Sequence, residues 1–335
     1  CTNIGITGRG IIDGNGAQWR PVKVDKFAKW ELLQVKKLGG VMRGDDSLWY
    51  PWNSSYGYKN VAETPEKQEK MRNYLFRVFH CKNILLQGVT IQNSPKFHVH
   101  PFNSENVILD GITVRCPWNA QNGDAIDISD CHRVLIVNCT VDCGDDGLCM
   151  KSGNAKDGDI NGCEDILIQD NTVFHAHGGF VIGSESICGM KRIVVRDCTF
   201  SGTDIGLRFK SAIGRGGKCE DIFISSISMA DIKDAAIHFE CAYADRPAGS
   251  KASAGLIVEN AKFVPEFCDI HISDIVCENA AIGISASGIE GLNCVYDIDV
   301  ANSTIIYTGV PDKIDASTAR LNISGVNFIK AGSLR

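Results

Sequence analysis

The chain has 335 residues, of which 44% are hydrophobic and 22% are charged, with 34 glycines against 9 prolines. This composition is typical of a globular protein and excludes collagen, a coiled coil and wholesale disorder. The formal net charge of -6 argues against a nucleic-acid partner, because phosphate groups need a basic surface. No run of about 18 apolar residues occurs, so the sequence predicts no membrane span.

The first residues of the chain already follow a strand pattern. Ile4 and Ile6 lie two positions apart, and neither a basic segment nor an apolar export segment precedes them. We therefore expect the sequence to begin inside a domain and to lack the N-terminal segment of that domain.

Residues 20–73 interrupt the strand pattern. The segment is rich in lysine and aromatic residues, and its part from 24 to 38 is compatible with a helix. We interpret the segment as a long insertion in one unit of the fold, because long loops in compact domains often carry function. The alternative is a flap that only covers one side of the domain.

From residue 81 onward, a short β-branched phrase returns every 23 to 32 residues. The first apolar residues of its copies are Ile84, Val107, Val134, Ile166, Ile193 and Ile222. Periods of roughly 20–50 residues indicate a repeat architecture, and short units separated by Gly, Asn and Asp predict strands and turns. We therefore predict an all-β fold, a single-stranded right-handed parallel β-helix that forms one domain over residues 1–335. A weaker repeat resumes at 268, after an irregular stretch around 244–266.

The 15 cysteines recur at matching places in this repeat. Cys81, Cys131, Cys163 and Cys219 each stand at the beginning of a β-rich segment. Equivalent positions stack in a solenoid, so we expect mostly buried free thiols that form an internal ladder. Disulfide bridges between some of them are the alternative. No CxxC pair and no Cys/His cluster at zinc spacing occurs, so no metal site is predicted.

Aligned copies of the repeat bring ionisable residues into columns. Three segments align without gaps: residues 139–152, 171–184 and 198–211. This alignment places Asp145, His177 and Asp204 in one column. Because equivalent positions stack in a solenoid, we expect these three side chains to be neighbours.

A second alignment concerns two further carboxylates. Placing residues 123–128 on 145–150 puts Asp124 beside Asp146, with Asp145 next to both. Neighbouring parallel strands lie about 4.8 Å apart, and like charges at that distance raise each other's pKa. The arrangement is typical of an acid/base enzyme, in which one carboxyl group stays protonated while others are ionised.

Cations follow the acids along the chain. Arg208 and Lys210 are two positions apart, so they project from the same face of one strand. Steps of 31 residues separate Asp146 from His177 and His177 from Arg208, and Tyr243 follows Lys210 by 33. We interpret the series as one wall of a groove that binds an anionic polymer.

Four short motifs carry a resemblance to a known family. They are Asn-Gly-Asp at 122–124, Gly-Asp-Asp at 144–146, His-Gly-Gly at 177–179 and Arg-Phe-Lys at 208–210. In this order they resemble the signature motifs of glycoside hydrolase family 28, the polygalacturonase family. The resemblance covers roughly residues 1–245. Gly123 and Phe209 depart from the usual Thr and Ile of the family. Both residues are common in bacterial relatives, many of which look exo-acting.

The resemblance implies a pectin-lyase-like solenoid that hydrolyses α-1,4-galacturonosidic bonds of pectin with inversion, without a cofactor. Carried over by motif, Asp145 is the general acid that protonates the leaving oxygen. Asp124 and Asp146 activate the water, and His177 orients or tunes the acid. The family also implies a secreted or periplasmic protein, for which we favour a monomer that binds neither nucleic acid nor a membrane.

The resemblance assigns substrate binding to a second group of residues. Arg208 and Lys210 are expected to bind a galacturonate carboxylate, and Tyr243 matches the downstream tyrosine of the family by spacing. Further candidates for substrate contact are Asn122 in the first motif, Trp118 as a sugar platform, and His98 and His100 one coil upstream. Core packing is the alternative for the tryptophan and the favoured interpretation for the two histidines.

Other functions compete with hydrolysis of homogalacturonan. The same site is compatible with a hydrolase of rhamnogalacturonan or another decorated pectin. A calcium-dependent pectate lyase would need acidic residues around calcium, and the lack of a wider Asp cluster weakens that hypothesis. A non-catalytic carbohydrate-binding β-helix needs aromatic rows but has no use for stacked acids.

Overall fold

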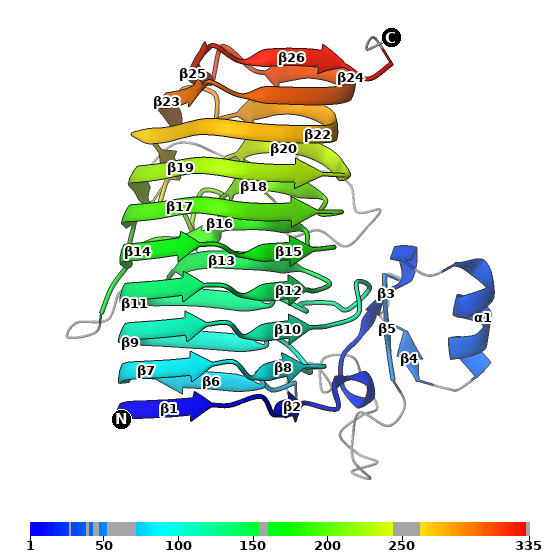
Figure 1. Cartoon of the computed structure of the whole chain (residues 1–335). Helices are drawn as coiled ribbons and strands as arrows, with labels where there is room; N and C mark the ends of the chain where they lie inside the picture. The colour runs from blue at the N-terminus through cyan, green and yellow to red at the C-terminus, as the bar shows by residue number, and fades with distance from the viewer. Residues whose placement is uncertain are drawn as a thin grey trace.

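The computed structural model describes residues 1–26, 28–37, 40–42, 47–51, 72–153, 160–243 and 262–332. Over these residues the chain winds into stacked coils of parallel strands, from the N-terminal coil at one end to the C-terminal coil at the other (Figure 1). The predicted all-β fold is therefore confirmed as a parallel β-helix. No helix among the described residues is both long and apolar enough to cross a membrane.

The coils place their strands in three stacks, and the longer strands bend to take part in two of them. The first stack consists of β1 (Thr2–Thr7), β7 (Lys82–Gln87), β9 (Val99–Asp110), β11 (Ile126–Val137), β14 (Cys163–Gln169), β17 (Met190–Ser201), β19 (Lys218–Ala230), β22 (Ile270–Ser287), β23 (Val295–Ala301) and β25 (Ala319–Ser324). The second stack consists of β2 (Ile11–Asp13), β8 (Thr90–Gln92), β10 (Thr113–Arg115), β12 (Thr140–Asp142), β15 (Thr172–Phe174), parts of β17, β19 and β22, β24 (Thr304–Ile314) and β26 (Asn327–Lys330).

The third stack contains the strands that will carry the site. It consists of β6 (Phe76–Phe79), parts of β9 and β11, β13 (Asp146–Ser152), β16 (Gly178–Ser186), β18 (Ile205–Lys210), β20 (Ile232–Glu240) and parts of β22 and β24. A short strand, β21 (Glu266–Phe267), pairs with β19 and β23.

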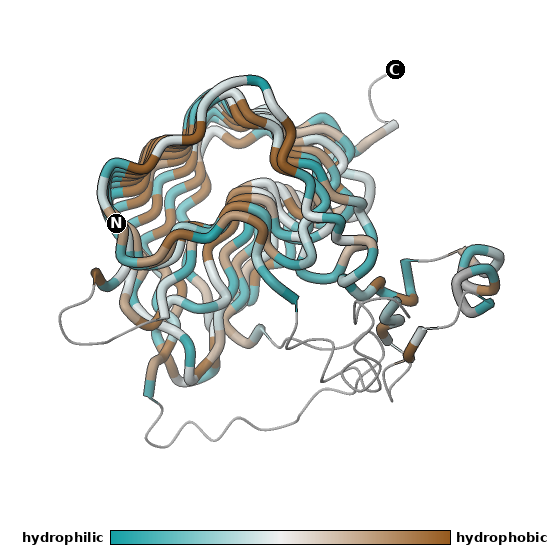
Figure 2. Tube along the Cα trace, turned by 90° about the horizontal axis from the view of Figure 1, so that it is seen from below, coloured by the Kyte–Doolittle hydropathy of each residue, from teal (hydrophilic) through white to brown (hydrophobic). Residues whose placement is uncertain are grey.

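The repeated apolar residues form an internal ladder. Ile84 pairs with Val107, Val107 with Val134, and Val134 with Ile166, and all four are buried. Seen along the axis, apolar residues recur at the same points of successive coils (Figure 2). Each fully buried side chain of this size stabilises the fold by roughly 1.5–3 kcal/mol, so the ladder explains why the phrase returns in the sequence.

The Asn and Asp residues of the phrase have a backbone role. Asn83, Asn106, Asp165 and Asp221 each directly precede a ladder residue and adopt φ angles of 60°, 55°, 58° and 56°. Asn and Asp tolerate this left-handed conformation better than most L-residues. The punctuation of the repeat therefore follows from a bend that most of the described coils make at this point.

The cysteines are free thiols, and all but Cys1 and Cys188 are buried inside the solenoid. Burial raises the pKa of Cys139 and of Cys163 to about 12, which keeps these thiols neutral. The prediction of mostly buried free thiols is confirmed.

Between β2 and β6 the chain leaves the β-helix and forms a small separate sheet. Its elements are turns of 3-10 helix at Gly16–Gln18 and Val24–Lys26, β3 (Val22–Lys23), α1 (Lys29–Lys37), β4 (Val41–Met42) and β5 (Leu48–Tyr50). The central strand β5 pairs antiparallel with both β3 and β4. The predicted helix between 24 and 38 is thus present as α1. Residues 52–71 of the insertion, and 244–261 of the second irregular stretch, lie outside the described residues.

The small sheet is fastened to the β-helix at one loop. Val22 forms an isolated β-bridge with Ala120, and the N–H of Gln121 donates to the carbonyl of Pro21 at 3.2 Å. This loop leads directly to Asp124. The insertion therefore stands beside the carboxylates that the alignment brought together.

Candidate active site

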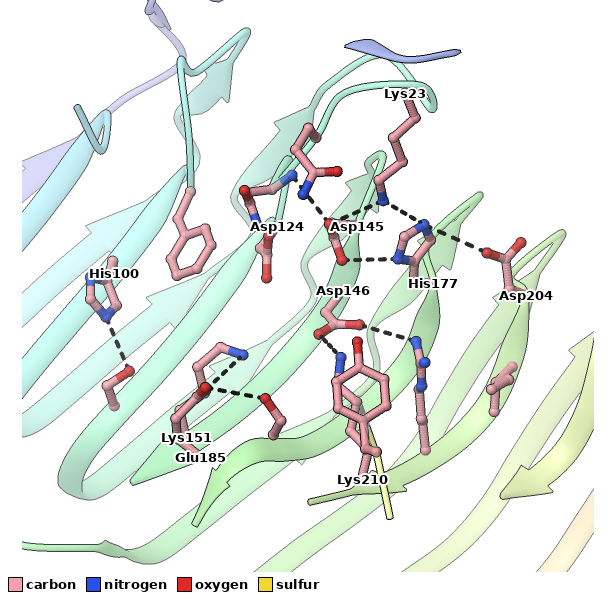
Figure 3. A pocket seen from close by; sticks show the side chains of 18 of the residues that line it. Lys23, His100, Asp124, Asp145, Asp146, Lys151, His177, Glu185, Asp204 and Lys210 are labelled. Carbon is pink, nitrogen blue, oxygen red and sulfur yellow. Dashed lines mark hydrogen bonds and ion pairs between the residues drawn. The ribbon is translucent and has the colours of Figure 1, made fainter. Parts of the chain in front are cut away.

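A cleft of about 990 Å³ opens where the small sheet meets the third stack. The residues that line it include Asp124, Asp145, Asp146, His177, Arg208, Lys210, Tyr243, Asn122 and His100. Several of these side chains point toward one another across the ends of neighbouring strands (Figure 3). The structure thus brings together ten of the twelve residues that the sequence singled out, since Asp204 also lines the cleft, whereas Trp118 and His98 do not.

The two carboxylates predicted to be neighbours lie on adjacent coils. The pairing of Ile126 with Leu148 puts Asp124 beside Asp146, and the N–H of Ala125 donates to the carbonyl of Asp146 at 3.0 Å. Asp124 is 3% exposed and Asp146 is 1% exposed. The predicted stacking of these two residues is therefore present in the structure.

Their surroundings push the two pKa values apart. Burial, and then the nearby carboxylates of Asp127, Asp145 and Asp146, raise the pKa of Asp124 well above its usual range. Burial acts on Asp146 in the same direction, but the charges of Lys210, Lys151 and Arg208 together outweigh it and lower the pKa of Asp146. The shifts favour the neutral form of Asp124 and the ionised form of Asp146, the kind of division that acid/base chemistry uses.

Asp145 lies at the mouth of this pair. Its Oδ1 is 2.9 Å from Nδ1 of His177, and its Oδ2 accepts from the N–H of Asn122 at 3.2 Å and lies 3.5 Å from Nζ of Lys23. Burial alone would raise the pKa of Asp145, but His177 and Lys23 hold it well below its usual range. Its side chain keeps 13% exposure, against 2% for that of Asp146, so Asp145 is the more accessible of the two.

The column of Asp145, His177 and Asp204 is also present. The N–H of His177 donates to the carbonyl of Asp145 at 2.7 Å, and the N–H of Ile205 donates to the carbonyl of His177 at 3.2 Å. Nε2 of His177 lies 3.7 Å from Oδ2 of Asp204. The gapless alignment of the three segments therefore reflects the real register of β13, β16 and β18.

The residues of the predicted series, from Asp146 to Tyr243, all line the same cleft. Arg208 pairs with Val181, as the alignment of residues 171–184 on 198–211 places it. Its side chain still reaches the acids, with Nη1 3.8 Å from Oδ1 of Asp146. A Cβ atom on Gly178 would lie 3.2 Å from Cβ of Arg208, so the glycine of this motif leaves room for the arginine to pass.

Lys210 and Tyr243 complete the cationic side of the cleft. Nζ of Lys210 is 2.7 Å from Oδ2 of Asp146, and the lysine is 4% exposed. The Tyr243 ring lies 5.1 Å from Nζ of Lys210 and 5.5 Å from the guanidinium carbon of Arg208. The aromatic face thus contacts both cations, which holds them in place beside the acids.

The remaining candidates lie at the edges or outside. Trp118 is 49% exposed and is not among the residues that line the cleft. His98 is buried, with Nδ1 at 2.8 Å from the carbonyl of Asp124 and Nε2 accepting from the N–H of Ser94, so its role is structural. His100 lines the far end of the cleft, where it stacks on Tyr74 at 4.8 Å and where burial lowers its pKa to about 3.

Sequence reasoning missed the lysines of the insertion. Nζ of Lys23 and Nζ of Lys26 lie 3.2 and 3.1 Å from Nε2 of His177, although the two lysines are more than 150 residues away from it. The only signal was the richness of residues 20–73 in lysine, which does not say which lysines reach the site. Lys151 belongs to one of the aligned segments but had no predicted role, and its Nζ donates to the carbonyl of Gly183 at 2.9 Å and lies 3.7 Å from Asp127.

Within the part of the chain that the structure describes, one group of residues has the composition and spacing of metal ligands. Asp145, Asp146 and His177 bring ligand atoms within 4.8 Å of one another. Lys23 already pairs with the first of these carboxylates and Lys210 with the second. Cations of the protein thus neutralise the charge that a divalent ion would need, and the residues present do not fit a metal site.

The family is now evident from the sequence as well as from the site. The family model for glycosyl hydrolases family 28 matches residues 27–266, which is most of the chain. The chain belongs to glycosyl hydrolase family 28.

Two curated relatives illustrate the range of the match. The chain is 27% identical over 278 residues to a probable polygalacturonase of Vitis vinifera, covering 82% of this chain and 52% of the relative. It is 24% identical over 339 residues to the exo-poly-alpha-D-galacturonosidase of Dickeya chrysanthemi, covering 99% of this chain and 54% of the relative. The chain therefore spans about half the length of these two relatives.

Solved structures agree with the fold. A hyperthermoactive exopolygalacturonase from Thermotoga maritima superposes with a TM-score of 0.73 at 25% identity, covering 98% of this chain and 70% of that one. A family 28 exopolygalacturonase from Yersinia enterocolitica has a TM-score of 0.63 at 18% identity, covering 99% and 60%, and shows the fold alone. The predicted right-handed parallel β-helix is confirmed.

Proposed function

We propose that this protein hydrolyses α-1,4-galacturonosidic bonds of pectin with inversion and that it acts from a chain end. The observation that carries the proposal is the pair Asp124 and Asp146, two buried carboxyl groups on adjacent coils whose pKa values are shifted in opposite directions. The cations Arg208 and Lys210 lie beside them and suit a uronate carboxylate. The names of the relatives from Dickeya chrysanthemi and Thermotoga maritima support the exo-acting form.

In this mechanism Asp146 is the base. Its lowered pKa keeps it ionised, so it can take a proton from the attacking water. Asp124, whose pKa is raised, is neutral and holds the same water by a hydrogen bond. The two neighbouring carboxyl groups thus have different tasks, which refines the expectation that both activate the water.

Asp145 is the proton donor in this proposal, because it lies at the mouth of the pair and keeps an exposed edge. In the protein without substrate, His177 and Lys23 keep it ionised. A sugar that enters between Lys23 and Asp145 and excludes water weakens one cause of the low pKa, so that Asp145 can take up a proton. The protonated Asp145 then donates to the leaving oxygen, while His177 at 2.9 Å orients the carboxyl group.

The position of the insertion supports action from a chain end. Ser47 and Leu48 of the small sheet, together with Lys23, Asp25 and Lys26, line the cleft on one side. A wall at this place favours a terminal sugar over a chain that passes through.

The proposal includes a secreted or periplasmic location, since pectin is a polymer met outside the cytoplasm. It also includes a monomeric state.

A second candidate substrate is rhamnogalacturonan or another decorated pectin. The far end of the cleft is aromatic: Tyr74 stacks on His100 at 4.8 Å, and Phe97 contacts the tyrosine edge-on at 5.1 Å. Apolar ring faces suit a neutral sugar better than a uronate carboxylate. A calcium-dependent lyase finds no such support, because the carboxylates are already paired with lysines.

Product analysis tests the proposed function. On polygalacturonic acid with a calcium chelator present, we expect release of saturated monogalacturonate with a rise in reducing ends. Chromatography and the absorption of unsaturated uronates are the two measurements. A ladder of oligomers would contradict exo action, and an absorbing product would contradict hydrolysis. Release of sugars only from rhamnogalacturonan would select the second candidate.

A further inference from the structure

The two lysines of the insertion form a cationic centre that the proposed mechanism has not paired with any charged group of the substrate. We define the lysine pair as Lys23 and Lys26. Both lysines lie beside His177, and Lys23 also lies beside Asp145, whereas Arg208 and Lys210 contact Asp146. Figure 3 shows Lys23 and Lys210 on different sides of the two aspartates. The cleft therefore has cations on two sides of its carboxylates.

The backbone holds the lysine pair in place. Lys23 belongs to β3, and its N–H donates to the carbonyl of Asn119 at 3.4 Å. Nζ of Lys26 donates to the carbonyls of Trp118 at 2.8 Å and of Gly144 at 3.3 Å. These contacts fix the backbone of Lys23 and the ammonium group of Lys26 beside the loops that carry the acids, so less conformational entropy remains to be lost when a ligand binds.

The lysine pair has hydrogen-bonding capacity for an anion. Both ammonium groups lie within 3.2 Å of Nε2 of His177. A neutral imidazole nitrogen has one lone pair and accepts from only one of them, so a donor of the other is left to offer to a ligand.

The electrostatics point to the same kind of ligand. Burial, and then the charge of Lys23, lower the pKa of Lys26 to about 8. Keeping two ammonium groups close together therefore has a cost, and a carboxylate bound between them would offset it. Lys23 shares the single carboxylate of Asp145 at 3.5 Å, a longer contact than the 2.7 Å between Lys210 and Asp146.

We propose that Lys23 and Lys26 form a second carboxylate-binding subsite of the cleft. The pair holds the carboxylate of one of the two sugars joined by the scissile bond, while Arg208 and Lys210 hold that of the other. This inference rests on the proposed function and deepens it. The site then recognises the carboxylates of two adjacent uronates. Substrates in which either of these carboxylates is methyl-esterified should therefore bind less well.

The test compares digalacturonate with its two monomethyl esters. For the wild type we expect kcat/KM to fall about 10-fold with either ester, since each loses one charge-assisted contact. Lys26→Gln should lower kcat/KM for the diacid about 10-fold. For one of the two esters, this variant should show the same kcat/KM as for the diacid. Lys23→Gln is a second variant with the same expected pattern. The ester whose effect disappears identifies the sugar that the pair holds.

Lys37→Gln is the matched control, because Lys37 is an exposed lysine on α1 of the same insertion. Its kcat/KM should fall with each ester by the same factor as that of the wild type. A lysine-pair variant that stays sensitive to both esters, whatever its overall activity, would overturn the subsite. If the wild type does not cleave digalacturonate, the proposed function fails on this substrate. Calorimetric affinities for the same three compounds then decide on the subsite by the same pattern.

Discussion

Replacing Asp145 with Asn is expected to lower kcat on polygalacturonate by roughly 10²–10⁴-fold, the usual contribution of a general acid. The amide keeps the shape of the side chain, but it has no acidic proton that it could transfer to the leaving oxygen. On an aryl galacturonide with a nitrophenyl leaving group the loss should be much smaller, because that group departs without a proton. Steady-state rates on both substrates are the measurement.

Two further variants make this result specific. Asp146→Asn removes the base and should lower the rates on both substrates by a similar factor, since both reactions need the activated water. Asp142→Asn is a control on the surface, where Asp142 pairs with His175 at 3.1 Å in a similar Asp–His contact. It should change neither rate. Full activity of the Asp145→Asn variant on polygalacturonate would show that another group donates the proton.

Replacing Lys210 with Met is expected to lower the free energy of unfolding by about 3–5 kcal/mol at pH 7, because it leaves the buried carboxylate of Asp146 without its main partner. The two side chains are 5% and 2% exposed and 2.7 Å apart. Arg208 at 3.8 Å compensates in part. Chemical denaturation of the variant and the wild type is the measurement.

The effect of Lys210→Met should depend on pH in a defined direction. The pKa of Asp146 is lowered in the folded protein, so its ionisation contributes stability above the pKa of the unfolded chain. That contribution is lost as the pH falls through the lower, folded-state pKa. Without Lys210 this contribution shrinks, so the difference in stability between wild type and variant should narrow as the medium becomes acidic.

Lys233→Met provides the matched control for this prediction. Lys233 also pairs with an aspartate, Asp204 at 2.9 Å, but its side chain is 56% exposed. An exposed ion pair contributes about 0–1 kcal/mol, so the control should unfold almost as the wild type does. A difference between wild type and Lys210→Met that is equally small would mean that the buried pair adds no net stability.

Much of the site could be predicted because the fold is close to one-dimensional. In a β-helix each coil packs on its sequence neighbours, so an alignment of copies without gaps is also a map of contacts. This is why the repeat alone places Asp124 beside Asp146, and His177 between Asp145 and Asp204. The strand register confirms these columns.

The repeat places the backbones of neighbouring coils, but it does not say how far a side chain reaches. The alignment of residues 171–184 on 198–211 puts Arg208 beside Val181, and the strand register confirms this pairing. The contact of Arg208 with Asp146, which lies two coils away, depends on the length of the arginine side chain and on the space left by Gly178. Only the three-dimensional packing decides such a contact.

The sequence by itself determined the solenoid, its buried thiols and its columns of acids, because all of these follow from a local pattern repeated coil after coil. The tertiary structure alone decided which lysines of the insertion enter the site. Lys23 and Lys26 reach His177 only because β3 docks on the loop at Ala120. That docking joins segments about 100 residues apart that share no repeat, and no periodicity in the sequence encodes it.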